Sequence, residues 1–360
     1  MSKPITISYS KVSTFKTCPQ KYYLNSTYPI EISNSALPFG KAVETGVDVV
    51  IEGGKLEDAK LKFQECWKRL PASRWEGPKD VFDSETIFYY GTDYDKQLIQ
   101  DDDVTQVEAW QKELLPETKL KWQDQMDMFS GALKDGTTIE GAERKFANRV
   151  MWLCCLRRGG LMIEAFVRDL LPKIEEVVSA QKSISIKNDE GDKVNGFIDY
   201  IMKLKGYDEP IVVDLKTAGK FYTGHDLNTS DQLGIYAAAE KINYIGYMVL
   251  SKTIKHDKSC DKCGHARENS RKTNCERCDE GKYTKVDSRA DTQLLVRKLR
   301  DGEAQEVMDD FSDVLLAVKN GVNWKNPGSC FDYNKKCEYY DFCWAGKKAE
   351  DLPGVKKKST

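Results

Sequence analysis

Residues 210–219 read PIVVDLKTAG, and this stretch decides the fold. The three consecutive apolar residues from Ile211 to Val213 are typical of a strand buried inside a sheet. The strand ends in Asp214 and Lys216, which stand two residues apart and therefore project from the same face. Charged side chains are costly to bury without partners, so this pair needs a structural or a chemical reason. Taken alone, the pair is also compatible with an ordinary surface salt bridge at a strand end.

The composition of the whole chain is that of a soluble globular protein. It has 360 residues, of which 31% are charged, and a formal net charge of −2. The length predicts one large or two modest domains, and the neutral balance gives no overall basic field for nucleic acid. No apolar run approaches the ~20 residues that span a bilayer, and the N-terminal MSKPITISYSK has no apolar core of the signal-peptide type. We therefore expect a cytoplasmic protein, or a viral protein that acts in the host cytoplasm.

Strand and helix patterns surround the opening stretch in an order typical of an α/β domain. Strands are expected at residues 177–186, 194–204, 211–218 and 245–254. Helices are expected at residues 8–25, 38–53, 55–70, 139–172, 228–242 and 292–321, with helices and loops of weak periodicity over 72–135. Ser10 or Ser13 would cap the first helix, Asn228 or Ser230 the fifth, and Gly321 would end the last. These patterns predict a mixed sheet with helices on both sides, carried mainly by residues 174–256.

A second aspartate is expected to join the first at one point of this sheet. Asp199 lies near the middle of the strand that precedes Asp214, and the short turn between the strands makes them hairpin neighbours. Two converging carboxylates repel each other and need a cation, and hard oxygen ligands favour Mg²⁺ or Mn²⁺. Lys216 can orient an attacking water or stabilise the charge on a phosphate. Together these groups suit phosphodiester hydrolysis.

The order GFID, hairpin, VVDLK and then QLGIY on a helix resembles the PD-(D/E)XK nuclease superfamily, and more closely its RecB-like exonuclease branch. The resemblance implies a restriction-endonuclease-like core with Asp199, Asp214 and Lys216 at its metal-binding centre. Gln232 and Tyr236 match the Q-x-x-x-Y motif of that branch, which contacts DNA or supports the site. The alternative interpretation of these two residues is an ordinary amphipathic helix.

An earlier helix is expected to supply a third metal ligand. In PFGKAVETG, Glu44 stands four residues after Gly40, where the RecB-like branch usually carries a histidine. Glutamate also binds Mg²⁺ or Mn²⁺, so we expect Glu44 in the catalytic site. The alternative is a helix residue that faces solvent.

The eleven cysteines of the chain are clustered, which in a reducing compartment indicates metal rather than disulfides. The first set comprises two C-x-x-C pairs, Cys260 with Cys263 and Cys275 with Cys278. Two such pairs about a dozen residues apart can surround one tetrahedral zinc ion and order a polar insert that has no core of its own. Lysines and arginines in the insert suggest contact with DNA or with a partner protein.

The second set of cysteines joins the two ends of the chain. Its members are Cys18, Cys330, Cys337 and Cys343. The arrangement is similar to that of AddB-type and CRISPR-associated RecB-like nucleases, which implies a [4Fe-4S] cluster. The six residues between Cys330 and Cys337 depart from the two that those families have, which leaves zinc or no metal as alternatives. Cys66, Cys154 and Cys155 lie in helical contexts and are expected to be apolar packing.

These observations predict a nuclease domain with an inserted zinc ribbon. The domain would comprise residues 1–256 and 284–350, with a helical part over 1–172, a catalytic sheet core over 174–256, the ribbon over 257–283 and a flexible basic tail over 351–360.

The expected function is that of a Mg²⁺- or Mn²⁺-dependent deoxyribonuclease, an exonuclease on single-stranded DNA or duplex ends in recombination, repair or replication. The chain has no G-x-x-x-x-G-K-[ST] phosphate loop, so unwinding would need a separate helicase or recombination protein. The alternatives are a non-catalytic DNA-binding or assembly component with a nuclease-like fold, and a zinc-ribbon interaction module with an incidental α/β domain.

Overall fold

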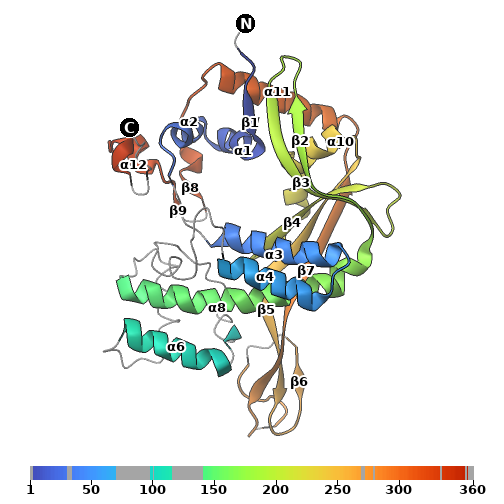
Figure 1. Cartoon of the computed structure of the whole chain (residues 1–360), viewed down its shortest axis with the longest axis vertical. Coiled ribbons are helices and arrows are strands. Elements are labelled where there is room, and N and C mark those ends of the chain that lie inside the picture. The colour runs from blue at the N-terminus through green and yellow to red at the C-terminus, as the bar shows by residue number, and fades with distance from the viewer. Residues whose placement is uncertain are drawn as a thin grey trace.

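The computed structural model of the chain is a mixed α/β protein in which helices cover both faces of one twisted sheet (Figure 1). It describes residues 3–30, 35–69, 98–99, 101–115, 141–268, 272–278, 280–332, 335–352 and 355. Much of the segment 72–135, and residues 356–360 of the expected tail, lie outside the described residues. Among the described residues, no helix is both long enough and apolar enough to cross a membrane.

The sheet has seven strands in mixed orientation. They are β1 (Thr6–Ser8), β2 (Ile174–Lys187), β3 (Lys193–Leu204), β4 (Ile211–Ala218), β5 (Tyr244–Cys260), β6 (Ala266–Arg267) and β7 (Tyr283–Lys298). β3 pairs antiparallel with β2 and β4, and parallel with β1. β4 pairs in parallel with β5, which in turn pairs antiparallel with β7. The four strands expected from the sequence are confirmed as β2 to β5, and β5 extends six residues beyond its expected end.

The apolar run of β4 is buried because both faces of the sheet carry a core. Ile211 and Val213 belong to one core, and Val212 to the other. The helices of the first face are α3 (Ala36–Ile51), α4 (Leu56–Arg69) and α8 (Gly141–Ala165), with α6 (Asp101–Leu114) outside α8. The helices of the second face are α1 (Tyr9–Thr17), α10 (Asp231–Glu240) and α11 (Glu303–Lys319). The prediction of helices on both sides is confirmed.

Several helix predictions are confirmed with changed ends. The stretch 8–25 forms two helices, α1 and α2 (Pro19–Thr27), and α1 begins after Ser8 rather than after Ser10 or Ser13. Ser230 caps α10 by accepting a hydrogen bond from the backbone of Leu233. The remaining short helices are α9 (Gly224–Asn228) and α12 (Tyr340–Trp344), with turns of 3₁₀ or π type at Phe166–Leu170, Leu171–Lys173, Pro327–Ser329 and Ala349–Asp351.

The expected helix over 292–321 is wrong in its first part. Residues 292–298 complete strand β7, and the helix begins only after Gly302, whose φ of +81° suits glycine. Leu294 and Val296 contact one core and Leu295 contacts the other. A run buried on both faces has no period that separates a strand from a helix, so pairing with β5 decided its structure.

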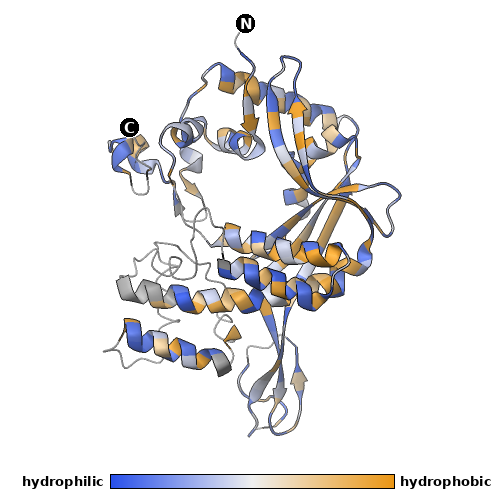
Figure 2. Cartoon of the chain, viewed as in Figure 1, coloured by the Kyte–Doolittle hydropathy of each residue, from blue (hydrophilic) through white to orange (hydrophobic). Residues whose placement is uncertain are grey.

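The cysteine-rich insert therefore follows one strand and precedes another, and does not lead directly into a helix. It forms the tip of the long β5–β7 hairpin, which projects past the helices in Figure 1. Figure 2 shows hydrophobic residues along the core strands and mostly hydrophilic residues at this tip. A tip without a hydrophobic core needs another source of order.

The strands β3 and β4 pair over only three residues before they separate. The pairs are Tyr200–Val213, Ile201–Val212 and Met202–Ile211. On the far side of Tyr200, β3 continues with β1 and β2 as neighbours, whereas β4 continues beside β5. The sheet therefore opens at the next pair of positions, which Asp199 and Asp214 occupy.

Candidate active site

Asp199 and Asp214 occupy opposing positions where β3 and β4 separate. The backbone N–H of Leu215 donates a hydrogen bond of 3.0 Å to Oδ2 of Asp199, in place of a ladder bond. The Asp199 carboxylate is therefore fixed against β4, immediately beside Asp214. This geometry bears out the expectation that the two aspartates meet as hairpin neighbours.

Lys216 completes the pair that ends β4. Its Nζ lies 2.6 Å from Oδ2 of Asp214, and the Asp214 side chain is only 6% exposed. Burial alone would lower the pKa of Lys216, but the Asp214 carboxylate outweighs burial and raises it to about 12. The lysine is therefore charged near neutral pH beside the Asp214 carboxylate.

Glu44 of helix α3 adds negative charge to the same region. Its carboxylate accepts a hydrogen bond of 3.0 Å from Lys41, and after burial its charge is a smaller cause of the raised pKa of Asp199 and of Asp214. Among the described residues, the oxygens of Glu44, Asp199 and Asp214 do not all lie within 4.8 Å of one another. One turn further along α3, Asp48 accepts a hydrogen bond from the Tyr200 hydroxyl, which fixes the helix on β3 next to Asp199.

Helix α3 also approaches β4 closely at a glycine. A Cβ at Gly40 would lie 3.2 Å from Oγ1 of Thr217, so a larger residue there would press on the strand one position after Lys216. The close approach brings the helix, and with it Glu44, toward the end of β4.

The three carboxylates hold more negative charge than Lys216 can balance. Burial, followed by repulsion from Asp214, raises the pKa of Asp199 to about 7, and burial also raises the pKa of Asp214. Within the described structure, Oδ2 of Asp214 is buried and accepts no hydrogen bond of good geometry, although Lys216 lies beside it. A buried oxygen of this kind, among carboxylates that repel one another, fits a divalent cation with oxygen ligands.

Gln232 and Tyr236 lie one helical turn apart on α10, which covers the second face of the sheet. The Gln232 amide donates a hydrogen bond of 3.4 Å to the Tyr236 hydroxyl. Tyr236 is 4% exposed, and a Cβ at Gly196 would lie only 2.6 Å from its hydroxyl oxygen. Such burial against β3 favours the supporting role over direct contact of Tyr236 with DNA.

A sheet that opens around two aspartates and a lysine, with a glutamate from the neighbouring helix, is the arrangement of a metal-dependent nuclease. The chain belongs to the PD-(D/E)XK nuclease superfamily, which it matches over residues 6–343. No curated protein matches the chain.

The four cysteines of the insert come together as expected. All four sulfurs lie within 4.8 Å of one another, and the pairs Cys260–Cys278 and Cys263–Cys275 are each 3.6 Å apart. A zinc ion that binds four sulfurs at about 2.3 Å in a tetrahedron places them about 3.8 Å apart. The cluster therefore has the dimensions of a single-ion site.

Two neighbours of this cluster support the same interpretation. A Cβ at Gly281 would lie 2.3 Å from the Cys260 sulfur, so only glycine fits beside the sulfurs. Nδ1 of His265 makes a hydrogen bond of 2.7 Å with the Tyr283 hydroxyl, which accounts for this histidine outside the cluster.

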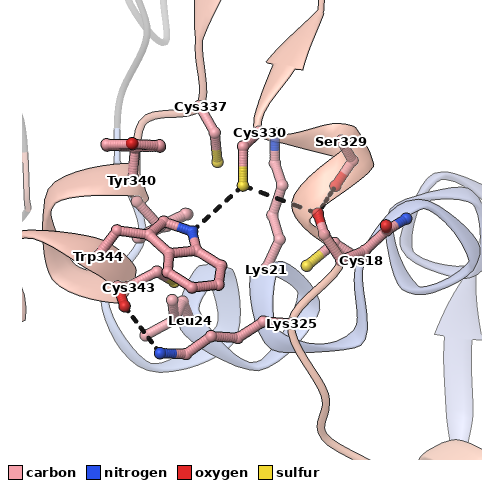
Figure 3. A pocket seen from close by; sticks show the side chains of 12 residues that line it. Cys18, Lys21, Leu24, Lys325, Ser329, Cys330, Cys337, Tyr340, Cys343 and Trp344 are labelled. Carbon is pink, nitrogen blue, oxygen red and sulfur yellow. Dashed lines mark hydrogen bonds between the residues drawn. The ribbon is translucent and has the colours of Figure 1, made fainter.

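The second set of cysteines lines one pocket between the two ends of the chain (Figure 3). Cys18 comes from the junction of α1 and α2, and the other three from residues 330–343. The β8–β9 hairpin (Phe331–Asp332 with Lys335–Lys336) occupies the long gap between two of them. It folds back so that the Cys337 N–H donates a hydrogen bond of 2.8 Å to the Cys330 carbonyl. The departure in spacing is therefore absorbed by a small hairpin that leaves these two cysteines as neighbours.

The sulfurs of this pocket are more widely spaced than those of the insert. Within the described residues, no three of them lie within 4.8 Å of one another. The Trp344 indole donates a hydrogen bond of 3.3 Å to the Cys330 sulfur, and Lys325 donates one of 2.8 Å to the Cys343 carbonyl. Of the other cysteines, Cys154 and Cys155 are buried and Cys66 packs against the core, as expected.

Two residues of the active-site region were not expected from the sequence, Asp48 and Tyr200, and a third, Gln181, was noticed on the strand before Asp199 but not assigned to the site. Asp48 and Tyr200 are joined by a hydrogen bond across 152 positions of sequence, which no local pattern reveals. Only the position of Asp48, one helical turn after Glu44, was a local signal. Gln181 donates a hydrogen bond to Glu44 from strand β2.

The raised pKa of Asp199 predicts a stability that depends on pH in the metal-free protein. The pKa of Asp199 is 3.8 in the unfolded chain and about 7 in the folded chain. Between pH 4 and pH 7 the folded protein therefore holds a proton on Asp199 that the unfolded chain has released. The free energy of unfolding should therefore fall as the pH rises from 4 to 7. We expect Asp199→Asn to raise the melting temperature of metal-free protein by about 2–4 °C at pH 8 and to leave it nearly unchanged at pH 4.

Thermal unfolding followed by circular dichroism, in chelator at both pH values, measures this effect. Added Mg²⁺ should raise the melting temperature of the wild-type protein at pH 8 and not that of the variant. An equal shift at pH 4 and pH 8 would contradict the assignment to Asp199.

Proposed function

We propose that the protein is a Mg²⁺- or Mn²⁺-dependent deoxyribonuclease that hydrolyses phosphodiester bonds at the opening between β3 and β4. The observation that carries this proposal is the convergence of Glu44, Asp199, Asp214 and Lys216 from three elements. In this proposal the three carboxylates hold one or two divalent ions. The ions would supply an activated water and offset the charge of the phosphate.

The roles of the side chains follow from their charges and contacts. Asp214 is buried and pairs with the half-buried Lys216, and the raised pKa of the lysine keeps its ammonium charged. That charge can stabilise the negative charge that develops on the phosphate. The backbone N–H of Leu215 fixes the Asp199 carboxylate. Tyr236, hydrogen-bonded to Gln232, packs against β3 at Gly196 and supports the strand.

An exonuclease that acts on single-stranded DNA or on duplex ends is the form of this activity that we propose. Phe197 stands two residues before Asp199 on β3 and is 62% exposed. An exposed ring next to a phosphate-cleaving centre offers a surface on which an unpaired base can stack. Such an activity suits recombination, repair or replication, with unwinding supplied by a separate helicase.

The alternative is a non-catalytic DNA-binding component that keeps the nuclease fold. The presence of Glu44, in place of the histidine usual in the RecB-like branch, is the only observation that favours it. A carboxylate at this position is still a ligand for hard cations, and its charge acts on Asp199. The complete set of charged groups therefore supports catalysis.

A cleavage assay separates the two functions. End-labelled single-stranded DNA, blunt duplex and closed circular DNA would be incubated with the protein in Mg²⁺, in Mn²⁺ and in chelator. We expect metal-dependent shortening of the linear substrates from their ends and no cleavage of the circles. Binding of DNA with no cleavage in either metal would establish the non-catalytic function instead.

We also propose that the two cysteine sets bind different metals. The sulfur distances of 3.6 Å in the insert match a single tetrahedral zinc ion. The wider spacing around Cys18 suits a larger group, and thiolates are the usual ligands of a [4Fe-4S] cluster. The cluster would tie the N-terminal helices to the C-terminal segment, alongside the hydrogen bond of 2.7 Å between Tyr339 and Asn25.

Metal analysis after anaerobic purification checks this assignment. We expect brown protein with a broad visible absorbance band, about four irons and one zinc per chain. Cys18→Ser should remove the iron and leave the zinc, whereas Cys275→Ser should do the opposite. Colourless protein with two zinc ions per chain would contradict the cluster.

A further inference from the structure

We propose that Gln181 is a positioning residue that holds Glu44 in the orientation needed to bind the catalytic metal. The inference rests on the function proposed above and adds a residue from strand β2 to that site. It is carried by the backbone of Gln181, by its place opposite Asp199 and by its hydrogen bond to Glu44.

The backbone of Gln181 has a conformation that strands do not favour. Its φ is +49°, and among the described residues only Lys241 shares a positive φ without being glycine. Lys241 follows the last turn of α10, where a left-handed residue is the ordinary way to end a helix. Gln181 instead lies inside a strand of 14 residues, where this conformation is strained for a residue with a Cβ.

The strained position lies directly opposite the first catalytic aspartate. The strand pairs Ala180–Tyr200 and Lys182–Ile198 flank it, which places Gln181 across from Asp199. The core contacts change at the same point, because Ile198 belongs to one core and Tyr200 to the other. In a regular strand Ile198 and Tyr200 would point to the same face of the sheet. The side chains therefore change face at the position where Gln181 lies opposite Asp199.

The side chain of Gln181 uses this position to reach helix α3. Its Nε2 donates a hydrogen bond to Oε1 of Glu44, the same oxygen that accepts one from Lys41. Both known donors therefore hold one oxygen of the glutamate and leave Oε2 for another partner. A carboxylate held by one oxygen is restricted in rotation, so its second oxygen keeps one direction.

A role in strand shape alone would favour a different residue at this position. Glycine adopts positive φ without strain, so it would give the same turn of the strand at lower cost. A glutamine keeps the strain and adds an amide that contacts Glu44. Strain that persists beside a reaction centre indicates that the side chain has a function there.

The test separates the amide from the backbone with two variants and a matched control. Gln181→Gly removes both the amide and the strain, whereas Gln181→Ala removes the amide and keeps the strain. Lys241→Gly relaxes the only other positive φ of this kind among the described residues, at the end of α10. Each variant is titrated with Mn²⁺ by calorimetry. The same titration of Asp199→Asn measures how much Mn²⁺ binds elsewhere on the chain. Melting temperatures of all variants are recorded without divalent cations.

We expect the dissociation constant for Mn²⁺ to rise about tenfold in both Gln181 variants. Gln181→Gly should melt at a higher temperature than Gln181→Ala, and Lys241→Gly should melt higher than the wild-type protein with unchanged Mn²⁺ binding. Cleavage should need more metal in the Gln181 variants and recover most of its rate at saturating Mn²⁺. Wild-type affinity for Mn²⁺ in both Gln181 variants would overturn the role of Gln181 and leave the proposed nuclease intact. Wild-type protein that binds no more Mn²⁺ than Asp199→Asn would overturn both.

Discussion

Replacement of Lys216 by alanine is expected to lower Mg²⁺-dependent cleavage of DNA about 10³-fold. The ammonium of Lys216 is the only cationic group within 4 Å of the buried Asp214 carboxylate in the described structure, and its pKa of about 12 keeps it charged. Its removal takes away the charge that would stabilise the phosphate as the bond breaks. Initial rates on end-labelled DNA at pH 7 and pH 9 measure the loss, and a loss of the same size at both pH values is expected for a residue that acts through its charge.

Two controls separate this effect from damage to the fold. Lys203 forms an ion pair of 2.6 Å with Glu176 on the same sheet, but both partners are well exposed, so Lys203→Ala should leave cleavage unchanged. Lys216→Arg keeps a positive charge and should retain part of the activity. Circular dichroism in the presence of Mg²⁺ confirms folding of each variant, and full activity of Lys216→Ala would remove this residue from the mechanism. Asp214→Ala should likewise abolish cleavage.

Loss of the proposed zinc ligands is expected to unfold the tip of the β5–β7 hairpin and to leave cleavage of short DNA largely intact. The tip has few apolar residues, and binding of zinc by four thiolates contributes on the order of 10 kcal/mol to folding in small modules. The Cys275→Ser/Cys278→Ser double variant should lose its zinc and become about tenfold more sensitive to trypsin between residues 261 and 282. Metal analysis and mass spectrometry of the first cleavage products check both effects.

The chain offers a control and a sharper deletion for this experiment. Cys66 packs against the core outside the cluster, so Cys66→Ser should keep the zinc and the resistance to trypsin. Cys260 and Tyr283 are paired across the hairpin, so an Asn-Gly turn can replace residues 261–282 without a break in the strands. Retained cleavage by this deletion would make the ribbon accessory, whereas lost cleavage would make it part of the catalytic unit.

The active site was predictable from local sequence to the extent that each group follows a short pattern. The IVV run predicts a strand that ends in Asp214 and Lys216, and the preceding strand carries Asp199 near its middle. The structure brings Asp199 and Asp214 to opposing positions. The alternative of an exposed salt bridge is excluded for Asp214, whose side chain is only 6% exposed. Because Asp214 is buried, water screens its charge less than it would at the surface, so its interactions with neighbouring charges are stronger.

Predictions failed or stayed open where backbone pairing decides the structure. Leu294, Leu295 and Val296 pack against the two cores in turn, so only the pairing of residues 292–298 with β5 shows that they form a strand. The six residues between Cys330 and Cys337 look like a departure in spacing until the hairpin between them is seen. In both cases hydrogen bonds between backbone segments decide a structure that the order of side chains leaves open.

The sequence by itself determined the α/β class, the burial of β4 and the residue types of the charged centre, because these follow from periodicity and from the chemistry of single side chains. Only the tertiary structure decided that β3 and β4 separate at the aspartates, that α3 brings Glu44 to them, and that Gln181 takes a strained conformation to hold it. The last two features depend on contacts between residues more than 100 positions apart. Such contacts are fixed by the joint packing of helices and sheet, and no local segment of the chain contains them.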